Sequence, residues 1–245
     1  MSPDTASKVI YMAECASAAY DGRIPTKLPF QEHFYLHDGQ IGKHRGFVGI
    51  SEGWAIIALK GTKSFKDFLE DAKVAKVPFL DDPRWMIHRG FDEEFNKIWP
   101  VLEKRFEKFP GSILVSGHSL GASLAALVAF ALREVLHLDS EVCLLAPPRI
   151  GTPQFARAYE ERCPMTWAFR HDLDIVPQIP KFGYVDTAKL IHLQSNGIPI
   201  KPARTLWAKI KLFFRTVESI LDFEDIEDHD RRDYVRAVTA YCLNF

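Results

Sequence analysis

The segment that decides the fold of this 245-residue chain is Ile113-Leu114-Val115-Ser116-Gly117-His118-Ser119-Leu120-Gly121. An apolar strand leads into a Gly-x-Ser-x-Gly turn, and a long run of small and apolar residues, Leu120–Leu132, follows it. In a strand–turn–helix of this kind the serine adopts a strained backbone conformation, and side chains at Gly117 and Gly121 would collide with neighbouring elements. We therefore expect Ser119 at the carboxyl edge of a sheet, facing the N–H groups of the helix.

This context predicts that Ser119 is a nucleophile. Two glycines around a serine occur often by chance, but the strand before them and the helix after them are typical of a nucleophile turn. The backbone N–H of Leu120, directly after the serine, is then one of the two donors that an oxyanion requires. His118 precedes the serine, points away from it and is interpreted as a packing residue.

The remainder of the chain predicts a single α/β domain over residues 1–245. Runs typical of helices alternate with the later strands, whereas the first strands follow one another directly. This order indicates a central mixed, mostly parallel sheet flanked by helices. The predicted strands are Phe34–Leu36, Phe47–Ile50, Ala55–Leu59, Ile113–Ser116, Val142–Ala146, Thr166–Phe169 and Leu190–Leu193, and the predicted helices are Phe91–Phe106, Leu120–Leu132, Pro153–Arg162, Leu206–Leu221 and the segment after His229.

Composition excludes several classes of protein. With 31 basic and 32 acidic residues, the chain has no excess positive charge for binding nucleic acid. The longest uncharged apolar stretch, Ser119–Leu132, is too short to span a bilayer. The cysteines lack metal or redox spacing, so we expect buried, reduced thiols and no metal site; the only pair considered for a disulfide is Cys15 with Cys242, among Cys15, Cys143, Cys163 and Cys242.

The start of the chain bears on its compartment. Met1–Lys8 contains no apolar segment of the kind found in a secretory signal, so the sequence as it stands predicts a cytoplasmic protein. A chain from which such a signal had been removed would look the same, and it would be secreted.

A serine nucleophile needs a base, and in α/β-hydrolases the order along the chain is serine, acid, histidine. His137 lies near the far end of the helix after Ser119, roughly 25 Å away. His171 precedes the acid candidates, and His192 lies within an apolar strand. His229 remains, in a polar stretch that we expect to be a loop before a helix.

The acid should follow the strand Thr166–Phe169. Asp172 and Asp174 are both in range, and the sequence barely separates them. Val176-Pro177 and Ile179-Pro180 predict a rigid, extended exit after Asp174, which favours that residue as the acid that orients His229.

The second oxyanion donor should come from the end of an earlier strand, and Gly61-Thr62 follows such a strand. In the next segment, Phe65, Phe68 and Leu69 share one face of a predicted helix. Either this helix packs its apolar face on the core, or it is a lid over an acyl site. The apolar stripe of Leu206–Leu221 leaves a similar choice between core packing and contact with a lipid surface.

Several segments together resemble the class 3 lipase family, the fungal triacylglycerol-lipase type of α/β-hydrolase. The likeness extends over about residues 8–240. Lys60, Phe68 and Pro148 depart from the family pattern, which usually has Arg, Trp and a Gly-x pair there. The matching segments, in the order of the family, are Ala58–Thr62 with Asp67–Asp71, His88–Phe91, Gly117–Gly121, Ala146–Gly151, and Asp174–Pro177 with Asp228-His229.

The resemblance implies the α/β-hydrolase fold and a triad of Ser119, Asp174 and His229, with Thr62 and Leu120 in the oxyanion hole and Phe65, Phe68 and Leu69 in a lid. It implies hydrolysis of carboxylic esters, above all acylglycerols, through an acyl-enzyme and without cofactor or metal. Transient contact with a lipid surface would accompany that activity. The alternatives are a feruloyl esterase or phospholipase A1 of the same fold, or a catalytically silent binding protein.

Overall fold

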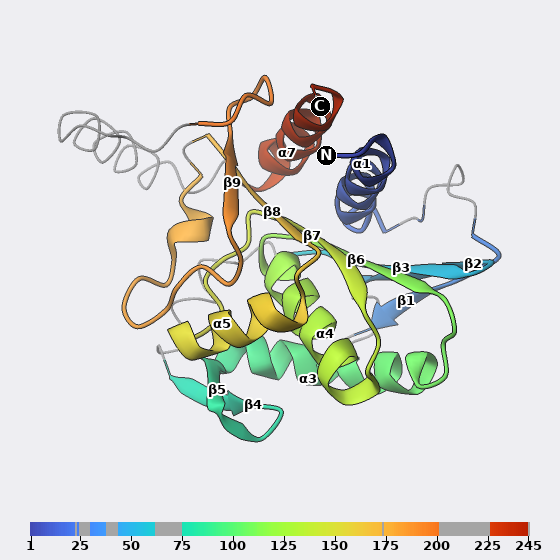
Figure 1. The fold of residues 1–245 in the computed structure, drawn as a ribbon, viewed down its shortest axis with the longest axis vertical. Helices are drawn as coiled ribbons and strands as arrows, with labels where there is room; N and C mark the ends of the chain where they lie inside the picture. Colours follow the sequence, from blue (N-terminus) through green and yellow to red (C-terminus); the bar gives the residue numbers. More distant parts are fainter. Residues whose placement is uncertain are drawn as a thin grey trace.

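The computed structural model describes residues 1–22, 24, 30–37, 44–61, 75–172, 174–200 and 226–244, and the side chains of the last segment from residue 231. A seven-stranded sheet forms its centre, in the order β1-β2-β3-β6-β7-β8-β9 (Figure 1). All seven predicted strands are present, with ends that differ by a few residues. They are β1 (Glu32–His37), β2 (His44–Ser51), β3 (Trp54–Leu59), β6 (Ser112–His118), β7 (Ser140–Leu145), β8 (Thr166–His171) and β9 (Leu190–Leu193).

The sheet is mixed, as the sequence predicts. β1, β2 and β3 pair antiparallel, and from β3 to β9 every neighbouring pair is parallel. Two residues, Glu52-Gly53, connect β2 to β3, and Gly53 has a φ of 77°. A two-residue turn can join only antiparallel strands, whereas parallel neighbours need a longer crossover. The carboxyl ends of the parallel strands therefore gather at one edge.

Helices cover both faces of this sheet. α3 (Arg89–Phe106), α4 (Leu120–Leu136) and α5 (Pro153–Arg162) lie on one face, and α1 (Pro3–Ala18) and α7 (Ile226–Leu243) lie side by side on the other (Figure 1). In β3, Ile57 and Leu59 pack towards α4, while Ile56 and Ala58 pack towards α1. Both faces of the strand are thus buried, which explains its uninterrupted apolar sequence.

The exit after Asp174 is not extended as expected, because Val176–Gln178 forms a short 3-10 helix, η1. Two further elements were not predicted from the sequence. One is helix α1, which begins with Ser2 as N-cap, its hydroxyl accepting the Thr5 N–H, and with Pro3 in the first turn. The other is a hairpin of β4 (Lys76–Phe79) and β5 (Asp82–His88), whose turn residues Leu80 and Asp81 both have positive φ. Neither residue is a glycine, so the usual composition signal for this tight turn is lacking.

One expectation about a loop is wrong. The polar stretch around His229 is not a loop before a helix, because α7 already begins at Ile226. Glu227 and Asp228 therefore lie in the first turn of the helix. The predicted helix Leu206–Leu221 lies outside the described residues, as do Thr62, Phe65, Phe68 and Leu69.

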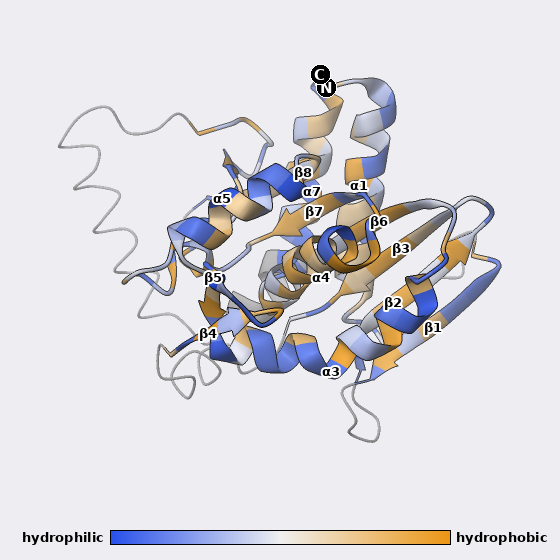
Figure 2. Ribbon diagram, turned by 60° about the horizontal axis from the view of Figure 1, so that its bottom comes forward, coloured by the Kyte–Doolittle hydropathy of each residue, from blue (hydrophilic) through white to orange (hydrophobic). Residues whose placement is uncertain are grey.

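The central helix α4 carries no charge from Leu120 to Leu132 and is buried throughout that stretch, between the sheet and the outer helices (Figure 2). Among the described helices, none is long and apolar enough to cross a membrane. All four cysteines are buried and unpaired, so Cys15 and Cys242 do not form the disulfide considered above. Burial raises the pKa of the Cys15 thiol to about 12, which keeps it protonated and unreactive.

The aromatic cluster under α4 gives a test of the core. Phe130 is fully buried among the rings of Phe79, Trp85 and Phe155, with ring centroids 4.9–5.8 Å apart. Phe130→Ala should lower the free energy of unfolding by about 3–5 kcal/mol, because it leaves a cavity in a packed core. Phe182 is 87% exposed, so Phe182→Ala should change the free energy of unfolding by no more than about 0.5 kcal/mol. Urea unfolding measures both, and equal losses would contradict this core assignment.

Candidate active site

Ser119 stands between the end of β6 and the start of α4, with φ 58° and ψ −127°. Non-glycine residues rarely adopt this conformation, which costs on the order of 1–3 kcal/mol and persists only where the surroundings impose it. The Ser119 N–H donates to the carbonyl of Leu145, at the end of the neighbouring strand β7, over 2.9 Å. The strained turn is thereby tied to the carboxyl edge of the sheet, where the sequence analysis expects the serine.

The two glycines around Ser119 allow backbones to approach closely. A Cβ atom on Gly117 would lie 2.1 Å from the carbonyl oxygen of Gly121, and a Cβ atom on Gly121 would lie 2.3 Å from the carbonyl oxygen of Leu59. Both distances are far below van der Waals contact. The first turn of α4 is therefore pressed against the end of β3, the strand that leads to Thr62.

The start of α4 and the end of β3, where the sequence predicts the oxyanion donors, meet at this contact. Leu120 opens α4, and within the described part of the chain the Ser119 side chain makes no capping hydrogen bond to the first-turn N–H groups. A Cβ atom built on Gly61 would be 3.1 Å from the Cβ of Ser119, so the Gly61 backbone lies directly beside the serine. Thr62 is the next residue and lies outside the described residues. Its role in the oxyanion hole stays a prediction, which this placement of Gly61 supports.

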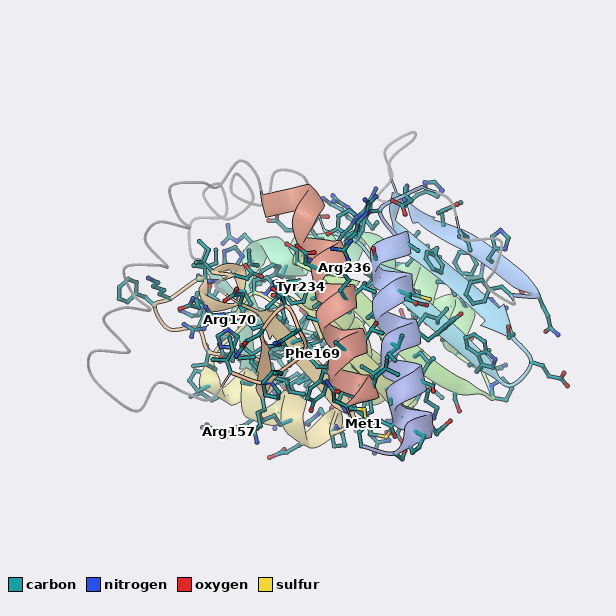
Figure 3. The ribbon with its side chains drawn as sticks, turned by 90° about the horizontal axis from the view of Figure 1, so that it is seen from above. Met1, Arg157, Phe169, Arg170, Tyr234 and Arg236 are labelled. Atoms are coloured by element: carbon teal, nitrogen blue, oxygen red, sulfur yellow. The ribbon has the colours of Figure 1, made fainter. Side chains whose placement is uncertain are left out.

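Asp174 follows β8 at the same edge of the sheet. One carboxylate oxygen accepts the Tyr234 hydroxyl over 2.6 Å, and the other accepts the backbone N–H of Val176 over 2.9 Å. Desolvation raises the pKa of the Asp174 carboxyl above its ordinary value, while these two hydrogen bonds and the charge of Arg170 oppose that rise. Figure 3 labels Tyr234 on α7 and Arg170 at the end of β8.

Asp172 is held differently. Its backbone has a φ of 34°, its N–H donates to the carbonyl of Leu193, and its carbonyl oxygen accepts from the His192 ring. The residue thus joins the ends of β8 and β9 through its main chain. Among the side chains that the structure describes, Asp174 bonds one from α7, the helix that carries His229, and Asp172 bonds none, so the geometry favours Asp174 over Asp172 as the acid.

Tyr234 was missed by the sequence analysis. Its hydroxyl donates to Asp174 and accepts the backbone N–H of His171 over 2.8 Å, and its side chain is buried. Tyr234 comes five residues after His229, about 7.5 Å further along α7 at the rise of an α-helix. The side chain of His229 lies outside the described residues, so its assignment as base stays a prediction.

Three other histidines have structural partners. The His88 ring accepts the Gly90 N–H over 3.1 Å and caps α3. His192 lies in β9 and bonds a backbone carbonyl, as expected for a strand histidine. His118 is buried against Tyr20 and Tyr234, which agrees with its interpretation as a packing residue. Among the described residues, no cluster of His, Cys, Asp and Glu side chains could hold a metal ion.

A mixed sheet with helices on both faces, and a strained serine between a parallel strand and a helix, define an α/β-hydrolase. Residues 56–184, just over half of the chain, match the family model Lipase (class 3). The chain belongs to the class 3 lipase family.

Two curated relatives give similar partial matches. The chain is 30% identical over 141 residues to "Secreted mono- and diacylglycerol lipase 3" of Gibberella zeae, covering 51% of this chain and 44% of the relative. It is 26% identical over 185 residues to "Phospholipase A1-II 1" of Oryza sativa, covering 59% of this chain and 46% of the relative. The chain thus spans a little under half the length of these relatives.

A solved structure supports the fold. It is described as a triacylglycerol lipase whose catalytic centre is formed by a serine protease triad. It superposes with a TM-score of 0.61 at 18% sequence identity, covering 77% of this chain and 79% of its own. At that identity the likeness establishes the α/β-hydrolase fold alone.

Replacing the Asp174 carboxylate should affect catalysis far more than stability. Because the pKa of Asp174 is raised in the folded protein, ionisation of its carboxyl opposes folding, and this penalty grows as the pH rises above the ordinary pKa of an aspartic acid. Asp174→Asn removes this penalty but also part of the hydrogen bonding, and the two effects oppose each other. The free energy of unfolding of the variant at pH 7 should therefore lie within about 1 kcal/mol of that of the unmodified protein. Ester hydrolysis should fall by on the order of 10⁴ in kcat.

Asp172→Asn is the matched control. Within the described part of α7, no side chain bonds the Asp172 carboxylate, so kcat should change less than about threefold. Esterase kinetics and urea unfolding of both variants measure the difference. A larger loss of kcat in Asp172→Asn than in Asp174→Asn would show that the wrong carboxylate has been chosen.

Proposed function

We propose that this protein is a serine hydrolase of carboxylic esters, with acylglycerols as the favoured substrates. The observation that carries the proposal is the strained conformation of Ser119, with the backbone of Gly61 beside it and the first turn of α4 behind it. A fold does not imply an activity, but a serine held in this way with oxyanion donors on two sides suits acyl transfer.

The mechanism follows from the roles of the residues. His229 takes the proton of the Ser119 hydroxyl as its oxygen attacks the ester carbonyl carbon, and the backbone N–H groups of Leu120 and Thr62 stabilise the oxyanion. The tetrahedral intermediate collapses, the ester C–O bond breaks, and His229 returns the proton to the departing alcohol. Water, activated by His229, then hydrolyses the acyl-enzyme.

Asp174 acts through His229. Its carboxylate orients the imidazole and stabilises the imidazolium without taking the proton itself. The carboxylate is in turn fixed by Tyr234 and Val176, so its direction is set before substrate binds.

The relatives support the substrate class. Their names specify mono- and diacylglycerol lipase activity and phospholipase A1 activity, and both cleave a carboxylic ester of glycerol. Phospholipase A1 activity is therefore the second candidate, favoured by the rice relative. Hydrolysis of emulsified triolein and of phosphatidylcholine vesicles, compared at equal ester concentration, separates the two.

Replacement of the nucleophile tests the reaction. Ser119→Ala should lower kcat for a dissolved p-nitrophenyl ester by several orders of magnitude and leave the fold intact, since the change removes one hydroxyl. A fluorophosphonate probe should label the unmodified protein at one site and leave Ser119→Ala unlabelled. If Ser119→Ala keeps near-normal esterase activity, the proposed function is wrong.

The segment after Thr62 predicts a response to the physical state of the substrate. If Phe65, Phe68 and Leu69 form a lid, a lipid surface stabilises its open form, because these side chains then leave water for hydrocarbon. Tributyrin hydrolysis should rise sharply above the solubility limit, and Phe68→Asp should weaken that rise while sparing a dissolved ester. A smooth saturation curve in the unmodified protein would assign the helix to core packing instead.

A further inference from the structure

A group of polar side chains, two of them buried, lies behind the nucleophile turn. We call it the Tyr20 cluster, and it consists of Tyr20, Asp21, His118 and Arg231. Tyr20 and Asp21 follow the C-cap of α1, Ala19, while His118 ends β6 and Arg231 lies in the first part of α7. Chain segments more than 200 residues apart in sequence meet here, at the same end of the sheet as Ser119.

The hydroxyl of Tyr20 holds the backbone of Gly61. It accepts the Gly61 N–H over 2.8 Å, and it lies 2.8 Å from Nδ1 of His118 and 3.3 Å from the His118 carbonyl oxygen. A Cβ atom built on Gly61 would lie 2.5 Å from this hydroxyl and 3.1 Å from the Cβ of Ser119. The residue before Thr62 is therefore enclosed between the Tyr20 hydroxyl and the nucleophile.

Arg231 ties the same tyrosine to α7. Its guanidinium lies 5.0 Å from the centre of the Tyr20 ring, within cation–π distance. It also donates to the Asp21 carboxylate over 2.8 Å and to the Ser17 carbonyl over 3.2 Å. Arg231 is two residues after His229, so these bonds anchor the start of the helix that carries the proposed base.

His118 serves the cluster as a neutral spacer. Burial, together with the charge of Arg231, lowers the pKa of His118 to about 3, so the ring is uncharged at any pH suited to an esterase assay. Its other face meets the edge of Tyr234, with ring centroids 5.7 Å apart. The cluster thus touches the side chain that bonds Asp174.

We propose that Tyr20 is a positioning residue for the oxyanion hole, because its hydroxyl fixes the Gly61 peptide beside Ser119. This inference rests on the proposed function, in which Ser119 is the nucleophile. Without the hydroxyl, the Gly61 N–H loses its acceptor, and the end of β3 can move by the few tenths of an ångström that oxyanion stabilisation does not tolerate. Arg231 and His118 hold Tyr20 in place.

The test is Tyr20→Phe, which removes the hydroxyl and keeps the ring under Arg231. Tyr35→Phe is the matched control, because the Tyr35 hydroxyl also accepts a backbone N–H, that of Ile24 over 3.1 Å, without contact to Gly61. For a dissolved p-nitrophenyl ester, Tyr20→Phe should lower kcat about 10- to 100-fold and change KM less than about twofold. Tyr35→Phe should leave both values unchanged.

Binding of a boronic acid inhibitor distinguishes a positioning role from a purely structural one, because a purely structural role of Tyr20 would leave the inhibition constant unchanged. Its tetrahedral adduct with Ser119 places an oxygen in the oxyanion hole, so its inhibition constant should rise in Tyr20→Phe by the same factor as kcat falls. If Ser119→Ala is inactive but Tyr20→Phe matches Tyr35→Phe in kcat and inhibition constant, the positioning role alone is wrong. A loss of kcat with an unchanged inhibition constant also overturns it.

Arg231→Lys keeps the test decisive if Tyr20→Phe does not fold. The lysine retains a positive charge but loses the planar fork over Tyr20. It should lower kcat and weaken boronate binding in parallel. Where both single variants fold, the double variant should lose little more than Tyr20→Phe alone, because the two residues act on one peptide. Unchanged boronate binding in Arg231→Lys, or fully additive losses in the double variant, would contradict the proposal.

Discussion

The positive φ of Ser119 is the constraint on which the rest of the site depends. A non-glycine residue holds such a conformation only when its surroundings leave no alternative. Here the Leu145 carbonyl accepts the Ser119 N–H. The backbone of Gly121 lies so close to Gly117 on one side and to Leu59 on the other that neither glycine could carry a side chain. The strain is therefore offset by three neighbouring strands that converge on one turn.

The architecture supplies that convergence. From β3 onward the strands run parallel, so their carboxyl ends lie at one edge, and β3, β6 and β8 bring Gly61, Ser119 and Asp174 there. The uncharged stretch of α4 buries the start of the helix between sheet and outer helices. A packed core has low compressibility, and this holds the donors at the N-terminus of α4 in a fixed direction.

The helices on the opposite face of the sheet contact the site through polar side chains. There α1 and α7 lie side by side (Figure 3). Polar contacts connect them to the site: Tyr234 bonds Asp174, and Arg231 contacts Tyr20 and Asp21. One orients the proposed acid and the other supports the proposed oxyanion side. The class 3 lipase match begins at residue 56 and ends at residue 184, so both helices lie beyond the matched segment.

The sequence by itself determined the parts of the protein that depend on neighbouring residues. The strand–turn–helix around Ser119, the seven strands and the mixed sheet are local patterns, and the structure confirms them. Only the tertiary structure put His229 within a helix. It alone also gave a reason to prefer Asp174 to Asp172, and it showed Tyr20, Arg231 and Tyr234 beside the proposed site. These depend on contacts between residues 41 to 210 positions apart, which neither periodicity nor a short motif records.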